Sequence, residues 1–130
     1  MAAVGAGQEK SSDLVLSALV RGRFGELLAP HVPQGGSDLF LLGLLSLIDV
    51  MLETPMADVL EKICLDQATK AVLLSQPSSL RPVFQLMLAH ESGEWESAAA
   101  LSGSLHLDSE DVAGYYWQAQ QWAREVSSGG

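Results

Sequence analysis

Basic residues are scarce in this sequence, and their scarcity limits what the protein can bind. Only 7 of the 130 residues are Lys or Arg, against 16 Asp and Glu, so the formal net charge is −9. Nucleic-acid backbones and anionic membrane surfaces both attract basic patches. We therefore expect no nucleic acid and no membrane among the partners.

Cysteine is nearly absent as well. Cys64 is the single one, so no disulfide can form within the chain, and a reducing compartment fits this composition. The sequence opens without a basic segment followed by an apolar one, so it does not resemble a signal peptide. We expect a cytoplasmic protein in which Cys64 is a small core residue, since no adjacent His or basic residue marks it as reactive.

The residue spacings that hold metals and phosphates are missing too. Within one predicted helix, none of His31, His90 and His106 has a carboxylate or a second histidine at ligand spacing. The glycines match neither the dinucleotide-binding nor the mononucleotide-binding pattern. We expect structural roles for the three histidines, and we expect neither a metal nor a cofactor.

The most apolar stretch covers residues 39–52 and reads LFLLGLLSLIDVML. On a helical wheel, Ser46 and Asp49 fall in one narrow stripe together with the acidic residues that flank the stretch, and nearly every other position is apolar. Such a helix is stable only when other helices surround it. A membrane span is the alternative, but it needs about twenty apolar residues, and this run is shorter. We predict a buried central helix over 38–53.

Capping and breaking residues divide the rest of the chain into six further helices. We expect them over residues 12–29, 55–63, 66–75, 80–90, 94–103 and 108–126. No segment alternates apolar and polar residues over the length of a strand. The predicted fold class is all-α, a compact multi-helix domain of about seven helices over 12–126. Residues 1–11 are expected to form a flexible N-terminal tail and 127–130 a disordered tail.

Particular residues mark the ends and contacts of these helices. The candidate N-caps are Ser37 or Asp38, Thr54 before Pro55, and Asp66. Gly93 is expected to close the helix that precedes it. Gly22 and Gly25 weaken their own helix, so they predict a place where another backbone approaches closely.

The last predicted helix holds the densest group of aromatic residues. Its core-facing stripe consists of Val112, Tyr115, Tyr116, Ala119, Trp122, Ala123 and Val126. Trp117 lies nearly opposite this stripe, beside Gln121, so either the helix is buried on two sides or Trp117 is exposed. Exposed Trp is a common anchor at protein interfaces. We expect partner contacts at Trp117 and Gln121, with a second patch at Trp95.

Acidic residues gather in the second half of the chain. Between Pro82 and Ala123 there is no Lys or Arg. The acidic residues of this segment are Glu91, Glu94, Glu96, Asp108, Glu110 and Asp111. They form either a solvated face that maintains solubility or a docking surface for a basic partner.

Several sequence segments resemble the C-terminal part of the HDOD domain, a degenerate relative of the HD phosphohydrolase fold in bacterial signalling proteins. They are LVRGRFGELLA before the central helix, TPMADVLEKI after it, and HESGEWESAAALSGSLHLDSEDVAGYYWQA near the end. The resemblance covers residues 13–122 and is closest to the form that follows an EAL domain in cyclic di-GMP-related proteins. A complete HDOD domain is longer at its N-terminus, so the resemblance implies a fragment or a shortened version.

The same resemblance bears on catalysis. Active HD enzymes carry a sequence motif of the type GLLHDIG, in which the His and the Asp bind a metal. Here Ser46 stands at the His position and Leu47 at the Asp position, and only Asp49 remains on the polar stripe. Leucine cannot coordinate a cation and a serine hydroxyl is a poor substitute for imidazole. The resemblance therefore implies a degenerate metal site.

Our leading hypothesis is a non-enzymatic signalling module, related to cyclic di-GMP signalling, that acts by docking to a partner protein or a neighbouring domain. Apolar surface left uncovered by a missing N-terminal portion would favour a homodimer. The alternative is a metal-dependent HD-type phosphohydrolase acting on a nucleotide or a cyclic dinucleotide. A third possibility is a small ligand in the space of the former metal site.

Overall fold

The computed structural model describes the backbone of residues 2–36 and 38–129 and the side chains of residues 13–34 and 38–128. All regular structure in these residues is helical, which confirms the predicted all-α class. The elements are α1 (Ala2–Leu28), η1 (Ala29–His31), η2 (Pro33–Gly36), α2 (Leu39–Leu45), α3 (Ile48–Leu52), α4 (Met56–Leu60), α5 (Gln67–Leu73), α6 (Arg81–Ser92), α7 (Trp95–Ser104) and α8 (Ser109–Gly129). None of these helices combines the length and the apolar content that a membrane crossing requires.

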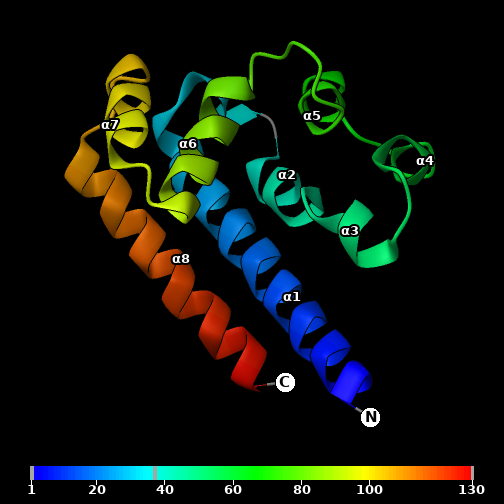
Figure 1. Cartoon of the computed structure of the whole chain (residues 1–130). Helices are drawn as coiled ribbons and strands as arrows, with labels where there is room; N and C mark the ends of the chain where they lie inside the picture. The colour runs from blue at the N-terminus through cyan, green and yellow to red at the C-terminus, as the bar shows by residue number, and fades with distance from the viewer. Residues whose placement is uncertain (1, 37, 130) are drawn as a thin grey trace.

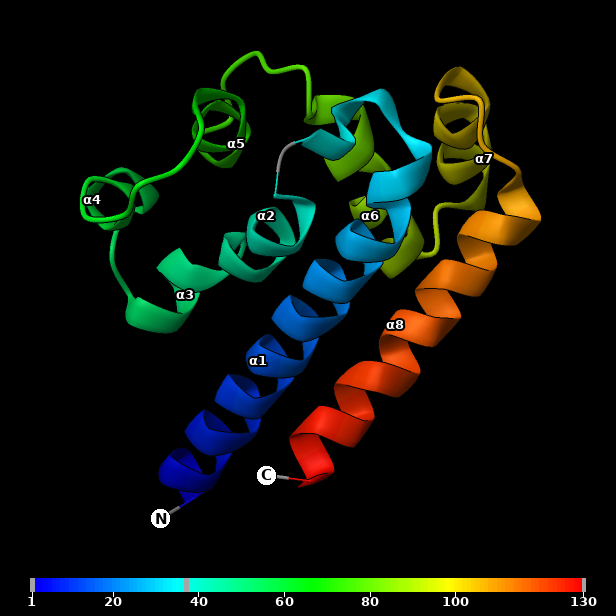
Figure 2. The same cartoon turned by 180° about the vertical axis from the view of Figure 1, so that it is seen from behind.

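Helix α1 organises the fold. It runs beside α8 in the opposite direction, and α2 packs on its other side (Figures 1 and 2). Helix α6 also contacts α1, and α7 packs against α6 and α8. The side chains of Phe24 and Leu28 in α1 are completely buried at the centre of this arrangement. The core thus forms around α1, and the short α4 and α5 lie at the edge of the molecule (Figure 1).

The prediction of one continuous buried helix over 38–53 is wrong. The helix breaks at Leu47, whose φ of −117° and ψ of 7° lie outside helical values, and the chain restarts as α3. Beside the break, the Ser46 hydroxyl donates a hydrogen bond to the Gly43 carbonyl oxygen at 2.7 Å. Such local side-chain bonds to the backbone compete with regular helix.

The break also limits burial. Helix α2 buries Leu39, Leu42 and Leu45, whereas α3 buries none of its residues. Val50 and Leu52 of α3 are 47% and 57% exposed, because the main neighbours of α3 are α2 and the short α4. The apolar content of this stretch was therefore a correct guide to burial only in its first half.

Glycines bring α1 and α2 into close contact, as Gly22 and Gly25 predict. A Cβ atom placed on Gly25 would lie 2.5 Å from the Leu39 carbonyl oxygen. One placed on Gly43 of α2 would lie 2.4 Å from the Arg21 carbonyl oxygen. Real Cβ atoms essentially never approach other atoms this closely. The two backbones can pack at this distance only because Gly25 and Gly43 lack a side chain.

Most of the predicted caps are in place. The Asp38 carboxylate accepts a hydrogen bond from Leu41 N at 2.9 Å, and Asp66 caps α5 in the same way. Gly93 ends α6 with a φ of 71°. Ser37, the other candidate at the start of α2, lies outside the described residues. Thr54 does not cap α4, because its hydroxyl donates instead to the Leu52 carbonyl oxygen.

Four further expectations differ from the structure. Helix α1 already begins at Ala2, within the expected N-terminal tail, and α8 continues to Gly129, into the expected C-terminal one. Cys64 is exposed and not a core residue, because it lies in the turn between α4 and α5. Within the predicted core stripe of α8, Val126 is also exposed, whereas Val112, Ala119 and Ala123 are buried.

Gly43→Ala tests the close contact of α1 and α2. The added methyl group would overlap the α1 backbone, so we expect the free energy of unfolding to fall by about 1–3 kcal/mol. Gly114→Ala in α8 is the matched control, since a Cβ there meets nothing within 4 Å. It should stabilise the protein by about 0.5–1 kcal/mol through helix propensity. Urea unfolding measures both, and equal effects would contradict the glycine contact.

Candidate functional site

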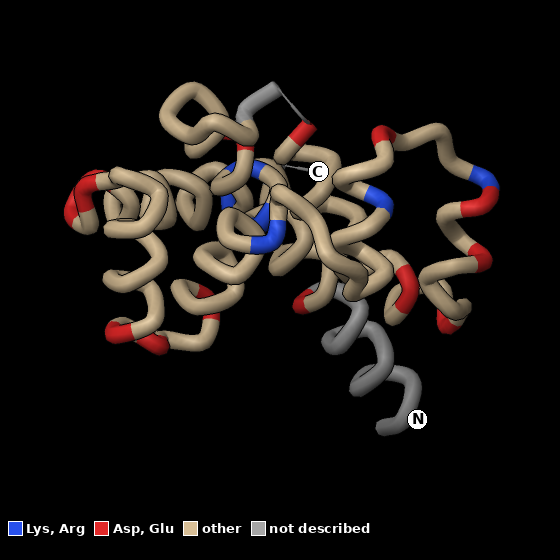
Figure 3. The backbone as a smooth tube through the Cα atoms, turned by 90° about the horizontal axis from the view of Figure 1, so that it is seen from above, with Lys and Arg blue, Asp and Glu red and all other residues tan. Residues whose placement is uncertain are grey.

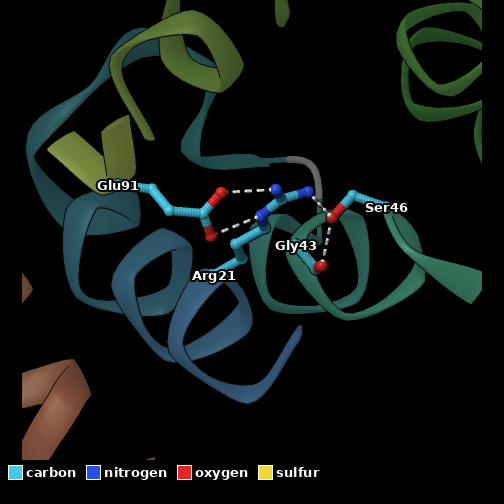
Figure 4. Close-up of polar contacts among 4 residues, drawn as sticks. All are labelled: Arg21, Gly43, Ser46 and Glu91. Atoms are coloured by element: carbon cyan, nitrogen blue, oxygen red, sulfur yellow. Dashed lines mark hydrogen bonds and ion pairs between the residues drawn. The ribbon is translucent and has the colours of Figure 1, made fainter. Parts of the chain in front are cut away.

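The predicted degenerate site lies in a hydrogen-bonded network that joins three helices. Arg21 of α1 donates through Nη1 to the Ser46 hydroxyl at 3.0 Å, and that hydroxyl donates to the Gly43 carbonyl oxygen (Figure 4). Arg21 also forms a bidentate ion pair with Glu91 of α6, with Nε 3.0 Å from Oε1 and Nη2 2.5 Å from Oε2. The network therefore connects α1, α2 and α6.

The residues at this position do not fit a divalent metal. The Ser46 hydroxyl donates to the Gly43 carbonyl oxygen and accepts a hydrogen bond from the Arg21 guanidinium, which is a cation. Leu47 has no donor atom, and Asp49 lies beyond the helix break in the first turn of α3. Among the described side chains, no three or more His, Cys, Asp or Glu residues form a group that could hold a metal ion.

A group of four rings, here called the aromatic cluster, joins α1, α6, α7 and α8. It consists of Phe24, His90, Trp95 and Tyr116. The His90 ring is central, since its centroid lies 5.5 Å from those of Phe24 and Tyr116 and 5.7 Å from that of Trp95. Edge-to-face contacts of this kind stabilise a core beyond simple burial. His90 thus occupies a packed position in the fold.

The surroundings shift the pKa values of two ionisable groups in the aromatic cluster. Burial lowers the pKa of His90, because the charged imidazolium is poorly solvated there. Burial also raises the pKa of Tyr116, and the Glu91 carboxylate adds to this effect while Arg21 opposes it. The aromatic cluster and the Arg21 network are therefore electrostatic neighbours.

Two of the three predicted contact residues meet in one groove. Trp117 and Trp95 are 61% and 63% exposed, and both line a groove of about 540 Å³ between the end of α6, α7 and α8. The remaining lining residues are His90, Glu91, Ser92, Gly93, Ala113, Tyr116 and Gln120. Gln121, the third predicted contact, is partly buried and does not line the groove.

Sequence reasoning missed the groove itself. The two exposed tryptophans are 22 positions apart on different helices, and no sequence pattern shows that they share a surface. Gln120, which lines the groove in place of Gln121, differs from it by only one position. A helical wheel cannot show which of the two residues faces the groove unless the positions of the neighbouring helices are known.

The other two histidines lie elsewhere. His31 stacks on Tyr115 with ring centroids 5.3 Å apart, and its Nε2 shares a hydrogen bond of 3.1 Å with the Tyr115 hydroxyl. His106 lies in the turn between α7 and α8 with a positive φ of 60°. Neither shares a site with His90.

Two longer bacterial proteins are similar to nearly all of this chain. It is 26% identical over 121 residues to the cyclic di-GMP phosphodiesterase CdgJ of Vibrio cholerae, covering 92% of this chain and 28% of that protein. It is 25% identical over 122 residues to the uncharacterised protein YuxH of Bacillus subtilis, covering 92% and 29%. The chain thus spans less than a third of these relatives. No family model and no solved structure matches it, so the HDOD resemblance stays a prediction.

Glu91→Gln tests whether the ion pair to Arg21 holds the helices together. The two side chains are only 29% and 13% exposed, and their bonds link residues 70 positions apart. We expect a loss of about 1–2 kcal/mol in the free energy of unfolding. Glu26→Gln breaks the exposed Arg23–Glu26 pair within α1 and should change it by less than about 0.5 kcal/mol. Equal losses would show that the network has no special structural role.

The lowered pKa of His90 predicts a pH-dependent stability. The unfolded chain takes up a proton near the ordinary pKa of 6.5, whereas the folded chain resists it. Stability should therefore be complete above this pH and decrease as the pH falls below it. His90→Phe removes the titrating ring and should flatten this part of the profile. Urea unfolding between about pH 5 and pH 8 measures both proteins, and parallel profiles would contradict the assignment.

Proposed function

We propose that this chain is a non-enzymatic regulatory module of cyclic di-GMP-related signalling that acts by contact with a partner protein or a neighbouring domain. The observation that carries this proposal is the hydrogen bond from Arg21 to Ser46. In the resemblance of this chain to HD enzymes, Ser46 occupies the position of the metal-binding histidine.

A guanidinium at this position opposes metal binding for a simple electrostatic reason. Arg21 is permanently charged, and Glu91 holds it 3.0 Å from the Ser46 hydroxyl through two further bonds. A divalent cation beside Ser46 would be repelled by that charge at close range. The carboxylate of Glu91, which could have served as a ligand, is already paired with Arg21. These contacts favour a structural use of the former site.

The link to cyclic di-GMP comes from the similarity to the phosphodiesterase CdgJ. That alignment covers 28% of the relative, so the activity of the whole relative is not assigned to this chain. From this similarity we infer only that the chain takes part in cyclic di-GMP-related signalling. The exposed Trp95 and Trp117 supply the second element of the proposal, because exposed Trp side chains are typical anchors of protein contacts.

An assay of the purified full chain tests the non-enzymatic part. We expect no hydrolysis of cyclic di-GMP in the presence of Mn²⁺ or Mg²⁺, and no stoichiometric metal by mass spectrometry after desalting. Asp49→Asn is the matched control, because Asp49 is the carboxylate that remains on the predicted polar stripe. Turnover or bound metal that disappears in Asp49→Asn would overturn the proposal in favour of an HD-type phosphohydrolase.

The contact part of the proposal has a separate readout. Trp117→Ala should reduce retention of partner proteins on the immobilised chain, whereas Leu52→Ala, an equally exposed apolar change on α3, should leave it unchanged. Retention and self-association that are both unaffected by Trp117→Ala would remove this residue from the contact surface. Light scattering of the same variants reports on the predicted homodimer.

A further inference from the structure

We propose that the groove between α6, α7 and α8 binds a basic segment of a partner protein, with a cationic side chain over the tryptophans and an uncharged side chain in a deeper cavity. This inference rests on the proposed function, because it names the chemistry of the partner. Three observations carry it: the aromatic walls, an unpaired buried hydroxyl, and the charge of the surrounding surface.

The aromatic walls suit a cation. Trp95 and Trp117 are both more than half exposed and line the same groove, so their ring faces remain accessible to a ligand. Lys and Arg side chains bind to the faces of tryptophan rings through cation–π attraction, and Trp is the best partner among the aromatic residues. A cationic side chain also covers apolar ring surface with its own methylene groups.

A smaller cavity continues from the groove toward the core. Its volume is about 180 Å³, and it shares His90, Trp95 and Ala113 with the groove. The other lining residues are Ala98, Ala99, Ser102 and Ser109. None of these residues is charged at neutral pH when His90 is neutral, as its lowered pKa favours. The cavity is therefore suited to an uncharged side chain.

Ser102, one of the residues that line the cavity, has a buried polar atom without a partner in the described part of the chain. The residue is only 1% exposed, and its hydroxyl oxygen makes no hydrogen bond to any group in the described part of the chain. Buried hydroxyl groups are nearly always paired, so an unpaired one needs an explanation. Because the cavity is several times larger than the ~30 Å³ that one water molecule occupies in the liquid, a ligand side chain with one polar atom fits here.

The surrounding charge selects a basic ligand. No Lys or Arg occurs between residues 82 and 123, which include α7 and most of α6 and α8. In Figure 3 the side of the molecule with α7 carries only Asp and Glu among its charged residues. Such a field attracts basic peptides and repels phosphate groups. Of the two earlier interpretations of the acidic segment, the proposal adopts the docking surface.

Binding of defined peptides to the full chain tests the inference. The probe is a fluorescein-labelled peptide of five Arg–Tyr repeats, which offers both a cation and an uncharged side chain with one hydroxyl. The controls are five Glu–Tyr repeats, with the charge reversed, and five Arg–Gly repeats, without the side chain for the cavity. We expect the Arg–Tyr peptide to bind most tightly, the Arg–Gly peptide more weakly, and the Glu–Tyr peptide not at all.

Variants locate the binding. Trp117→Ala and Trp95→Ala should each weaken the Arg–Tyr peptide by about 3- to 30-fold, the range for a cation–π contact that excludes water. Leu52→Ala, exposed on α3 outside the groove, should leave its affinity unchanged. Added salt should weaken binding, because it screens the acidic surface. Circular dichroism confirms that each variant is folded.

Ser102→Ala tests the deeper cavity. It removes the unpaired hydroxyl, so we expect a higher Tm of the free chain together with weaker binding of the Arg–Tyr peptide and unchanged binding of the Arg–Gly peptide. A lower Tm, or equal affinity of the Arg–Tyr peptide for Ser102→Ala and the original chain, would contradict a role of the Ser102 hydroxyl in binding.

The remaining outcomes separate this inference from the proposed function. Absence of Arg–Tyr binding at millimolar concentration, equal binding of the Glu–Tyr peptide, or binding that is indifferent to both tryptophan variants would overturn the inference alone. Metal-dependent hydrolysis of cyclic di-GMP would overturn the proposed function and leave the peptide results to stand by themselves. If cyclic di-GMP displaces the Arg–Tyr peptide from the tryptophans, the ligand of the groove is a nucleotide and not a protein partner, which would overturn the inference.

Discussion

The close contact of α1 with α2 is the constraint on which the rest of the structure depends. Gly25 and Gly43 let the two backbones approach to a distance that no side chain would permit. Arg21 lies directly at this crossing, since its carbonyl group faces Gly43. In this arrangement its guanidinium reaches both Ser46 in α2 and Glu91 in α6. The close packing at the glycines and the Arg21 network thus lie at the same helix crossing.

The Arg21 network joins three helices with a chemistry different from that of a metal centre. A metal needs several lone pairs directed at one point, and it would draw together ligands from separate helices. A guanidinium supplies donors in a fixed fork, so it connects acceptors that lie on opposite sides of it. The Glu91 carboxylate and the Ser46 hydroxyl meet this requirement. The guanidinium therefore connects α1, α2 and α6 through hydrogen bonds and an ion pair.

Most local features were predictable from the sequence, whereas most features that depend on distant contacts were not. The caps at Asp38 and Asp66 and the end at Gly93 follow from residue type and position alone. The break at Leu47 does not, because apolar periodicity continues through it. The same limit applies to the candidate site, where the ion pair spans 70 positions and the two tryptophans 22. Pairing over such distances is decided by packing, which a single sequence does not specify.

The groove and the Arg21 network are connected through two residues of one helical turn. His90 lines the groove and contacts Phe24 of α1 within the aromatic cluster, while Glu91 lines the same groove and holds Arg21. A ligand beside the tryptophans would therefore contact the end of α6 that fixes α1 and, through Arg21, α2. A cationic ligand would also compete with Arg21 for the Glu91 carboxylate. Under the proposed binding, the Glu91 carboxylate would therefore be shared between a ligand in the groove and the Arg21 network.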